Sequence, residues 1–147
     1  MTRPARAPSP PPRAYLSIGS IVVDNIVLPD ARTRMGVLGG GARHAAIGMR
    51  VWTERVGLLA AAGRDLPASD RLALERAVDL RRLPRGDALS PRVWQLSEDD
   101  GRRTHLDRTD ADLFMAMCPR PDEFPADYAG VAGVRLECDA PDRSADG

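Results

Sequence analysis

The sequence predicts an α/β fold, built on a mostly parallel sheet with one appended β-hairpin. Strand-like runs rich in Val, Ile, Leu and Ala alternate with helix-like segments between residues 15 and 138. A run of three glycines, Gly39 to Gly41, joins a strand-like run to a helix-like one, and an Asp-Gly pair at residues 100–101 separates two alternating runs. Strands that alternate with helices are typical of parallel sheets, and an Asp-Gly pair between alternating runs indicates a hairpin.

The first half of the chain predicts three strands and one helix. Residues 15–24 form an apolar strand, which residues 25–28 continue. Residues 33–38 predict a short second strand that leads into the glycines, and residues 55–62 predict another buried strand. Between them, residues 43–52 predict a helix. Its expected apolar face consists of Ala45, Ile47, Gly48, Val51 and Trp52.

The second half predicts two helices, a hairpin and a last strand. Residues 68–83 carry apolar residues at helical spacing and predict a helix. Residues 91–106 predict the hairpin, because both of its arms alternate around the Asp-Gly turn. Residues 122–128 predict a short helix, and residues 131–138 predict the last strand.

The composition narrows the classes of function. The chain has 147 residues with 21 basic and 21 acidic side chains, and every basic residue among the 21 is arginine. With a balanced charge, the chain lacks the excess of positive side chains that is typical of nucleic-acid-binding proteins. Without lysine, neither a Schiff base nor a Walker-type phosphate contact is available. No apolar run is long enough for a membrane span. We therefore expect neither a nucleic-acid nor a membrane partner.

The cysteines and the two ends of the chain complete this organisation. Cys118 and Cys138 lack metal-ligand spacing and are interpreted as reduced thiols of a cytoplasmic protein. Residues 1–13 predict a disordered Pro-rich tail, and the polar residues 139–147 predict a second disordered tail. One globular unit over residues 14–138 is expected between them.

Four motifs occur in a characteristic order. The first strand ends in Asp24, and a Gly-Gly motif follows at residues 39–46. A strand that ends in Gly-x-Asp covers residues 56–65, and an Asp-Gly-x-Arg turn lies at residues 99–104. Together these motifs resemble the N-terminal half of the PfkB-type carbohydrate kinases, the ribokinase-like family. The resemblance implies a three-layer α/β/α sheet with a small β lid, here truncated.

The resemblance also implies a substrate site for a sugar or nucleoside. At the matching positions, Asp24 would bind sugar hydroxyls, while Gly39 and Gly40 would lie against the sugar ring. His44 stands where the family usually has asparagine, and Glu137 stands where some sugar kinases place a carboxylate that touches the substrate. Other interpretations stay open: Asp24 as a cap, the glycines as a tight turn, His44 packed at the helix start, and Glu137 facing solvent. Asp65 is interpreted as closing a turn and not as a catalytic base.

The family phosphorylates a sugar hydroxyl with ATP and Mg, using an Asp in a Gly-Ala-Gly-Asp motif of the C-terminal half. Residues 1–147 contain no matching motif. The resemblance therefore implies the substrate half of a kinase without its catalytic and ATP-binding half, inactive alone. A reading frame truncated or shifted near Cys138 is one hypothesis for this. A sugar-binding or regulatory protein and an unrelated small α/β protein are the alternatives. A half-sheet exposes an edge, so self-association is also expected.

Overall fold

The computed structural model describes residues 14–137, so the two predicted tails and Cys138 lie outside the described residues. Eight strands, three α-helices and two short 3₁₀ turns follow one another over this range. The strands are β1 (Tyr15–Ser20), β2 (Val22–Val27), β3 (Thr33–Gly39), β4 (Val56–Ala62), β5 (Asp79–Pro84), β6 (Arg92–Ser97), β7 (Arg103–Asp107) and β8 (Gly133–Glu137). The helices are α1 (Gly41–Met49), α2 (Ala68–Ala77) and α3 (Ala111–Ala116), and the 3₁₀ turns cover Pro121–Glu123 and Ala126–Tyr128.

Four parallel strands form the central sheet, in the order β5-β4-β1-β8. All seven residues of β4 are buried, and five of the six residues of β1 are buried. Strands covered on both faces are typically continuous apolar runs, and the sequence of β4, VGLLAAA, is one. The prediction of a mostly parallel α/β sheet is confirmed.

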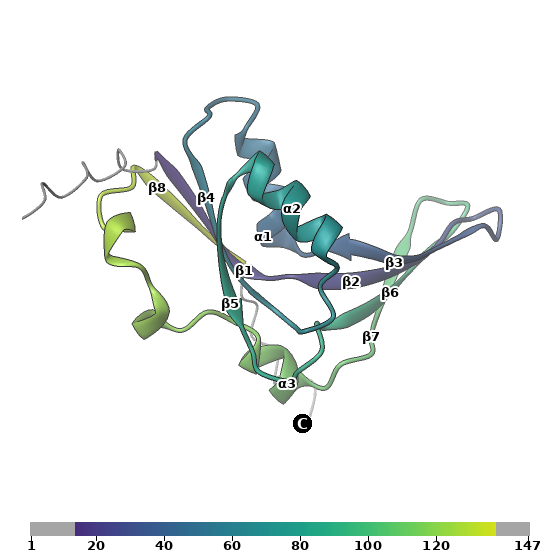
Figure 1. The fold of residues 1–147 in the computed structure, drawn as a ribbon. Coiled ribbons are helices and arrows are strands. Elements are labelled where there is room, and N and C mark those ends of the chain that lie inside the picture. Colours follow the sequence, from purple (N-terminus) through teal and green to yellow (C-terminus); the bar gives the residue numbers. More distant parts are fainter. Residues whose placement is uncertain (1–13, 138–147) are drawn as a thin grey trace, which may run out of the picture.

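Each face of the central sheet is covered by a different layer. Helices α1 and α2 lie on one face, and the segment with the two 3₁₀ turns crosses the other (Figure 1). The Oγ of Ser17 donates to the carbonyl of Ala42 over 2.8 Å, which fixes α1 on β1. The helix side of the core comprises Ile21, Ala42, Ala46, Val56, Leu58, Ala60, Ala62, Leu74 and Val78, and the other side comprises Leu16, Ile18, Leu59 and Tyr128.

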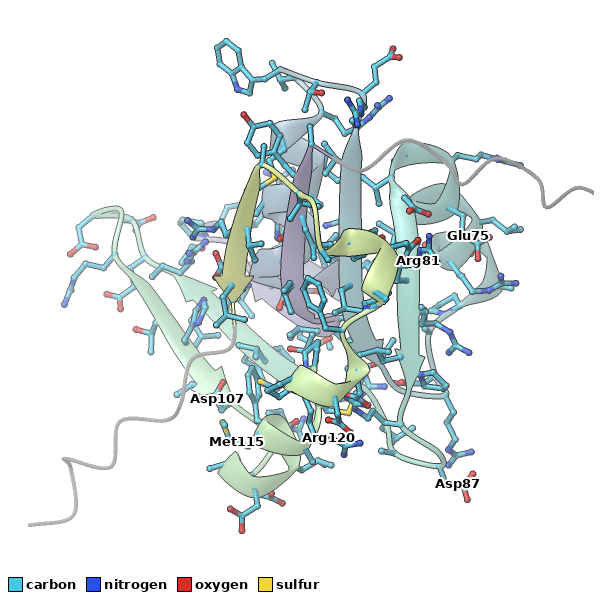
Figure 2. All side chains as sticks on the ribbon, turned by 90° about the vertical axis from the view of Figure 1, so that its left-hand side faces the viewer. Glu75, Arg81, Asp87, Asp107, Met115 and Arg120 are labelled. Carbon is cyan, nitrogen blue, oxygen red and sulfur yellow. The ribbon has the colours of Figure 1, made fainter. Side chains whose placement is uncertain are left out.

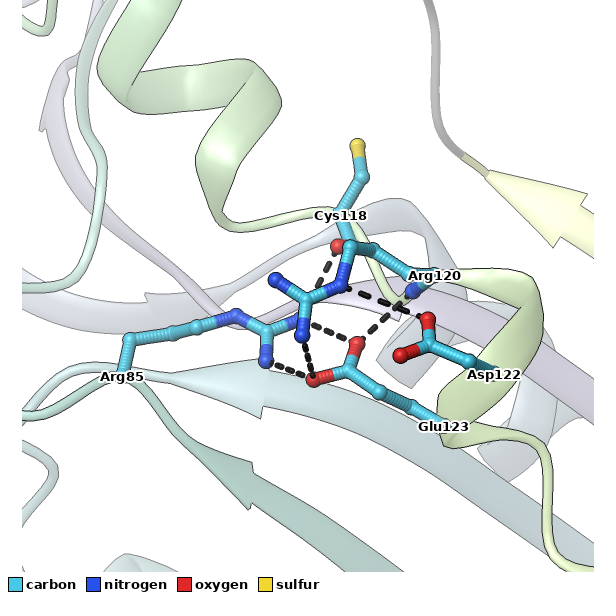
Figure 3. A network of polar contacts seen from close by, with 5 residues as sticks. All are labelled: Arg85, Cys118, Arg120, Asp122 and Glu123. Atoms are coloured by element: carbon cyan, nitrogen blue, oxygen red, sulfur yellow. Dashed lines mark hydrogen bonds and ion pairs between the residues drawn. The ribbon is translucent and has the colours of Figure 1, made fainter.

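An ion pair ties the 3₁₀ segment to the end of β5. Arg85 donates through both terminal nitrogens to the carboxylate of Glu123, and its Nη2 also donates to the carbonyl of Cys118 over 2.9 Å (Figure 3). The side chains of Arg85 and Glu123 are only 12% and 16% exposed. The hydrogen bonds from Arg85 lower the pKa of Glu123 to about 2. This pair holds the cover of the second face in place.

Four more strands form what we call the side sheet, in the order β3-β2-β6-β7. Strand β2 pairs in parallel with β6, while β3 and β7 are antiparallel to their neighbours. The predicted hairpin is confirmed: β6 and β7 are joined by a turn in which Gly101 has φ 84°. The side sheet extends away from the central sheet (Figure 1).

Two sequence predictions about the strands were wrong. The strand expected over residues 15–24 divides at Ile21, because Ile21 N–H donates to Ala61 of β4 while Val23 N–H donates to Pro91, just before β6. The helix expected over residues 68–83 ends at Ala77, and residues 79–84 become β5. The buried strand β4 needs a hydrogen-bonded neighbour on that side, and β5 provides it.

The helix predictions need similar corrections. Helix α1 ends at Met49, and the buried positions are Ala42 and Ala46, whereas Val51 and Trp52 of the expected apolar face are 78% and 89% exposed. The helix expected over residues 122–128 is two 3₁₀ turns, and α3 was not predicted. The capping carboxylate of Asp110, which accepts from Leu113 N–H over 2.8 Å, is the sequence signal for α3.

Candidate functional site

A cavity of about 600 Å³ lies where the two sheets meet the start of α1. Its walls come from the end of β1, the side sheet, the glycine connection before α1, Phe114 of α3 and Glu137 of β8. The cavity adjoins Ser20, the last residue of β1. In open α/β sheets, ligands bind beyond the carboxyl ends of the strands, so this place is the expected one for a site.

Asp24 is the buried carboxylate of this cavity. It is only 6% exposed and lies on β2, in register with Val37 on one side and Val93 on the other. Within the described part of the chain, its carboxylate has no hydrogen bond or ion pair with a side chain or backbone group. A buried carboxylate without a partner is costly, so the arrangement calls for hydrogen-bond donors from a ligand or solvent. The structure does not give Asp24 the alternative role of a cap.

The glycines permit close packing around this carboxylate. A Cβ atom on Gly39 would stand 2.2 Å from Oδ2 of Asp24, so only glycine fits there while Asp24 keeps its place. Gly40 has φ 102°, and a Cβ on it would stand 2.4 Å from the carbonyl oxygen of Ser20. Gly40 also occupies the N-cap position of α1. Gly39 thus makes room for the Asp24 side chain, and Gly40 makes a tight turn before α1. That the two glycines lie against a sugar ring stays a prediction.

His44 lines the cavity, but both of its ring nitrogens already have protein contacts. Its Nδ1 lies 3.0 Å from the carbonyl oxygen of Gly40, and its Nε2 lies 3.1 Å from Nη1 of Arg43. The tautomer that satisfies both contacts donates from Nδ1 and accepts at Nε2. In this geometry His44 stabilises the glycine turn at the helix start.

Glu137, at the end of β8, also lines the cavity and is half-buried. Its carboxylate forms an ion pair with Arg135. A Cβ on Gly41 would stand 2.7 Å from Oε2 of Glu137, which places this carboxylate against the first turn of α1. Carboxylates are favoured at helix N-termini, so Glu137 has a local structural role in addition to its place in the wall.

Polar residues of the hairpin were missed by the sequence analysis. Val93, which faces Asp24, pairs in register with Asp107 of β7, so all three project from the same face of the side sheet. The next row along that face contains Gln95 and His105. Figure 2 shows Asp107 at the end of β7, above α3. The alternation of residues 103, 105 and 107 was visible in the sequence, but it did not show which face of β7 lines the cavity.

Asp65 lies outside this cavity wall, as its interpretation as a turn residue requires. Its Oδ1 accepts from Ser90 N–H and its Oδ2 from Arg92, both over 2.8 Å. Burial alone would raise the pKa of Asp65, but the hydrogen bonds from Ser90 and the charge of Arg92 lower it overall. Asp65 therefore anchors the start of β6 to the loop after β4.

Among residues 14–137, no group of three or more His, Cys, Asp or Glu side chains is arranged to hold a metal ion. In the same range, every helix is too short or too polar to cross a membrane. The thiol of Cys118, the one cysteine in this range, is free and buried.

The fold is similar to those of solved sugar kinases. A ribokinase from Cryptococcus neoformans var. grubii serotype A, in complex with ADP, matches with a TM-score of 0.60 and 19% identity, over 86% of this chain and 41% of that chain. A fructokinase with bound ATP from Xylella fastidiosa matches with a TM-score of 0.51 and 14% identity, over 66% and 33%. An uncharacterized sugar kinase from Pyrococcus horikoshii matches with a TM-score of 0.52 and 19% identity, over 65% and 35%.

These likenesses identify the fold. The described chain has the ribokinase-like α/β fold, with the side sheet in the place of the expected small β lid. It spans about two fifths of the length of the Cryptococcus ribokinase and about a third of the other two kinases. The sequence matches no family model and no curated protein.

Proposed function

We propose that this chain is the substrate-binding part of an ATP-dependent carbohydrate kinase, whose ligand is a sugar or a nucleoside. The observation that carries the proposal is the carboxylate of Asp24, which is 6% exposed, has no protein partner in the described range and lines a cavity of about 600 Å³. The ribokinase-like fold supports the same assignment.

The chemistry of Asp24 suits a polyol. An ionised carboxylate only accepts hydrogen bonds, and its two oxygens can accept from two neighbouring hydroxyl groups. Hydrogen bonds to a charged acceptor are roughly twice as strong as neutral ones, and their strength rises where water is excluded. A vicinal diol would therefore offset the cost of burying Asp24.

The other predicted site residues have distinct proposed roles. Gly40 lets the backbone lie against the ring of the ligand, and Gly39 makes room for the side chain of Asp24. Glu137 accepts from a hydroxyl at the wall of the cavity while Arg135 balances its charge. His44 acts indirectly, by holding the turn at Gly40. These roles place binding, and not proton abstraction, in the described residues.

Phosphoryl transfer requires ATP and Mg. The sequence has no Gly-Ala-Gly-Asp motif, which carries the catalytic Asp of the kinases that it resembles. We therefore assign no catalytic step to this chain and expect it to bind its ligand without transferring phosphate. A sugar-binding or regulatory protein that acts by binding alone is the second candidate, favoured by the same observations.

Thermal unfolding of the purified chain, with and without a panel of sugars and nucleosides, tests the proposal. A ligand that binds the folded state raises the transition temperature. We expect a member of the panel to do so, Asp24→Asn to abolish the effect, and Asp99→Asn in the exposed hairpin turn to leave it unchanged. Stabilisation that survives in Asp24→Asn would refute the proposed site. ATP-dependent transfer by this chain would refute its assignment as a binding part.

Self-association and a cytoplasmic location are also proposals. Strand β8 is an edge of the central sheet, and its Val134 and Leu136 are 54% and 64% exposed. Exposed edge strands with apolar side chains favour pairing with other chains. Size-exclusion chromatography that gives a monomer at all concentrations would contradict self-association.

A further inference from the structure

The outermost strand of the side sheet contributes a polar row to the cavity. Arg103, His105 and Asp107 alternate along β7 and all line the cavity, whereas Thr104 and Leu106 project from the opposite face. In the described part of the chain, the guanidinium of Arg103 has neither a hydrogen bond nor an ion pair. This differs from Arg102, the neighbouring residue, which pairs with Asp100 and Glu98 in the hairpin turn.

The register of the side sheet gives the cavity a charge gradient. Asp24 and Asp107 belong to one row, because both are aligned with Val93. Gln95 and His105 form the next row, and Arg103 follows two residues beyond His105. The Cα atoms of Asp107 and Arg103 are four residues apart on one strand, a separation of about 13 Å at roughly 3.3 Å per residue. The acidic row therefore lies at one end and the free arginine at the other.

The other charged groups of the wall leave this gradient in place. Glu137 is balanced by its ion pair with Arg135. Arg43 is held at the β3 side, where its Nη1 donates to the carbonyl of Leu38 over 2.8 Å. Arg103 is thus the charged group at the hairpin end that has no compensating partner in the described residues.

We propose that the ligand is an acidic polyol, with its hydroxyl groups at Asp24 and its anionic group at Arg103. This rests on the proposed function and specifies its substrate class. The planar guanidinium presents paired donors that match a carboxylate or a phosphate, whereas the hydroxyl oxygens of a neutral sugar would accept from it without balancing its charge. Gln95 and His105, which lie between the two ends, supply donors and acceptors for intervening hydroxyls.

Calorimetric titration of the full chain with matched ligands tests this inference. Two neutral alditols, ribitol and glucitol, are compared with ribonate and gluconate, which carry a carboxylate, and with glucitol 6-phosphate. The expected result is about tenfold tighter binding of at least one anionic ligand than of its neutral counterpart, as for one added charge-assisted hydrogen bond. The preference should shrink as salt is raised from low concentration. Comparison of the carboxylates with the phosphate identifies the anionic group.

Two arginine variants distinguish the contribution of the arginine in the cavity from that of the arginine in the hairpin turn. Arg103→Gln should remove the preference for the anion and leave the affinity for the neutral alditol unchanged, while Arg102→Gln should keep the preference. Both side chains lie on the exposed hairpin, so we expect both variants to fold. Circular dichroism verifies this. If polyols bind in an Asp24-dependent way without any preference for an anion, this inference fails and the proposed function stands. If none of these five ligands binds, this inference fails, and the panel of sugars and nucleosides decides the proposed function.

Discussion

The two sheets of this molecule differ in what covers them. The inner strands of the central sheet are enclosed, since β4 is buried along its whole length and packs against side chains on both faces. The side sheet is open, and all five residues of its edge strand β7 are exposed. The side sheet nevertheless supplies most of the polar side chains of the cavity. We therefore expect the central sheet to provide most of the stability, and the proposed function assigns ligand recognition to the side sheet.

The largest expected effect is on the enclosed sheet. Leu58 of β4 is fully buried on the helix side, so Leu58→Ala removes packing and leaves a cavity. Such substitutions cost about 2–5 kcal/mol of the free energy of unfolding. Urea denaturation followed by circular dichroism measures it. A loss well below this range would contradict the assignment of stability to the central sheet.

The cover of the central sheet should be sensitive to acid. The pKa of Glu123 is lowered from 4.5 to about 2 by its bonds with Arg85, so the native state favours the ionised form. This contribution to stability is fully present above pH 4.5 and is lost as the pH falls from 4.5 towards 2. Glu123→Gln should therefore lower stability at neutral pH and flatten the pH dependence in that window, measured by denaturation at a series of pH values. Glu98→Gln in the exposed turn is the control, and an equal flattening there would count against the role of Glu123.

A substitution at the junction should affect recognition more than stability. Gly39→Ala places a Cβ atom against the carboxylate of Asp24, at 2.2 Å in the present geometry, so the carboxylate must move. We expect ligand-induced stabilisation to be lost, with a destabilisation of about 1–3 kcal/mol as is typical of overpacking. Gly48→Ala is the matched control, because a Cβ there meets nothing within 4 Å. Unchanged ligand binding by Gly39→Ala would show that Gly39 does not contribute to the site.

The smallest effect is expected on the open sheet. Leu106 of β7 is 49% exposed and projects away from the cavity. Leu106→Ala should change the free energy of unfolding by no more than about 0.5 kcal/mol, as is usual for surface positions. Measured beside Leu58→Ala, it gives the contrast between the sheets with the same chemical change. A loss as large as that of Leu58→Ala would show that the side sheet carries stability as well.

The sequence was most informative where local pattern and tertiary position agree. The continuous apolar run of β4 and the Asp-Gly turn predicted their elements correctly, because burial on both faces and turn chemistry are local properties. Residues 79–84 were different: their apolar spacing continued that of the preceding helix, and only the neighbouring strand β4 makes them β5. The apolar spacing of so short a segment does not show that the neighbouring strand β4 needs a hydrogen-bond partner.

The candidate site was predicted in part for a related reason. Asp24 and the glycines form a pattern along one stretch of the chain. The structure places Asp24, Gly40, His44 and Glu137 around one cavity, whereas Gly39 is buried against Asp24 and does not line it. Arg103 and Asp107 join them only through the register of β2, β6 and β7. Register depends on the pairing of strands far apart in sequence, which one sequence does not determine.

The division at Ile21 has a consequence for hydrogen exchange. The amides of Ile21 and Val23 are two residues apart, and each donates over 2.8 Å, the first to Ala61 of the central sheet and the second to Pro91, just before β6 of the side sheet. Exchange of a bonded amide requires the opening of the unit to which its acceptor belongs. If the side sheet opens by itself, the amide of Val23 exchanges during that local opening. The amide of Ile21 then exchanges only when the whole domain opens. A boundary between two cooperative units then lies within a single extended run of backbone.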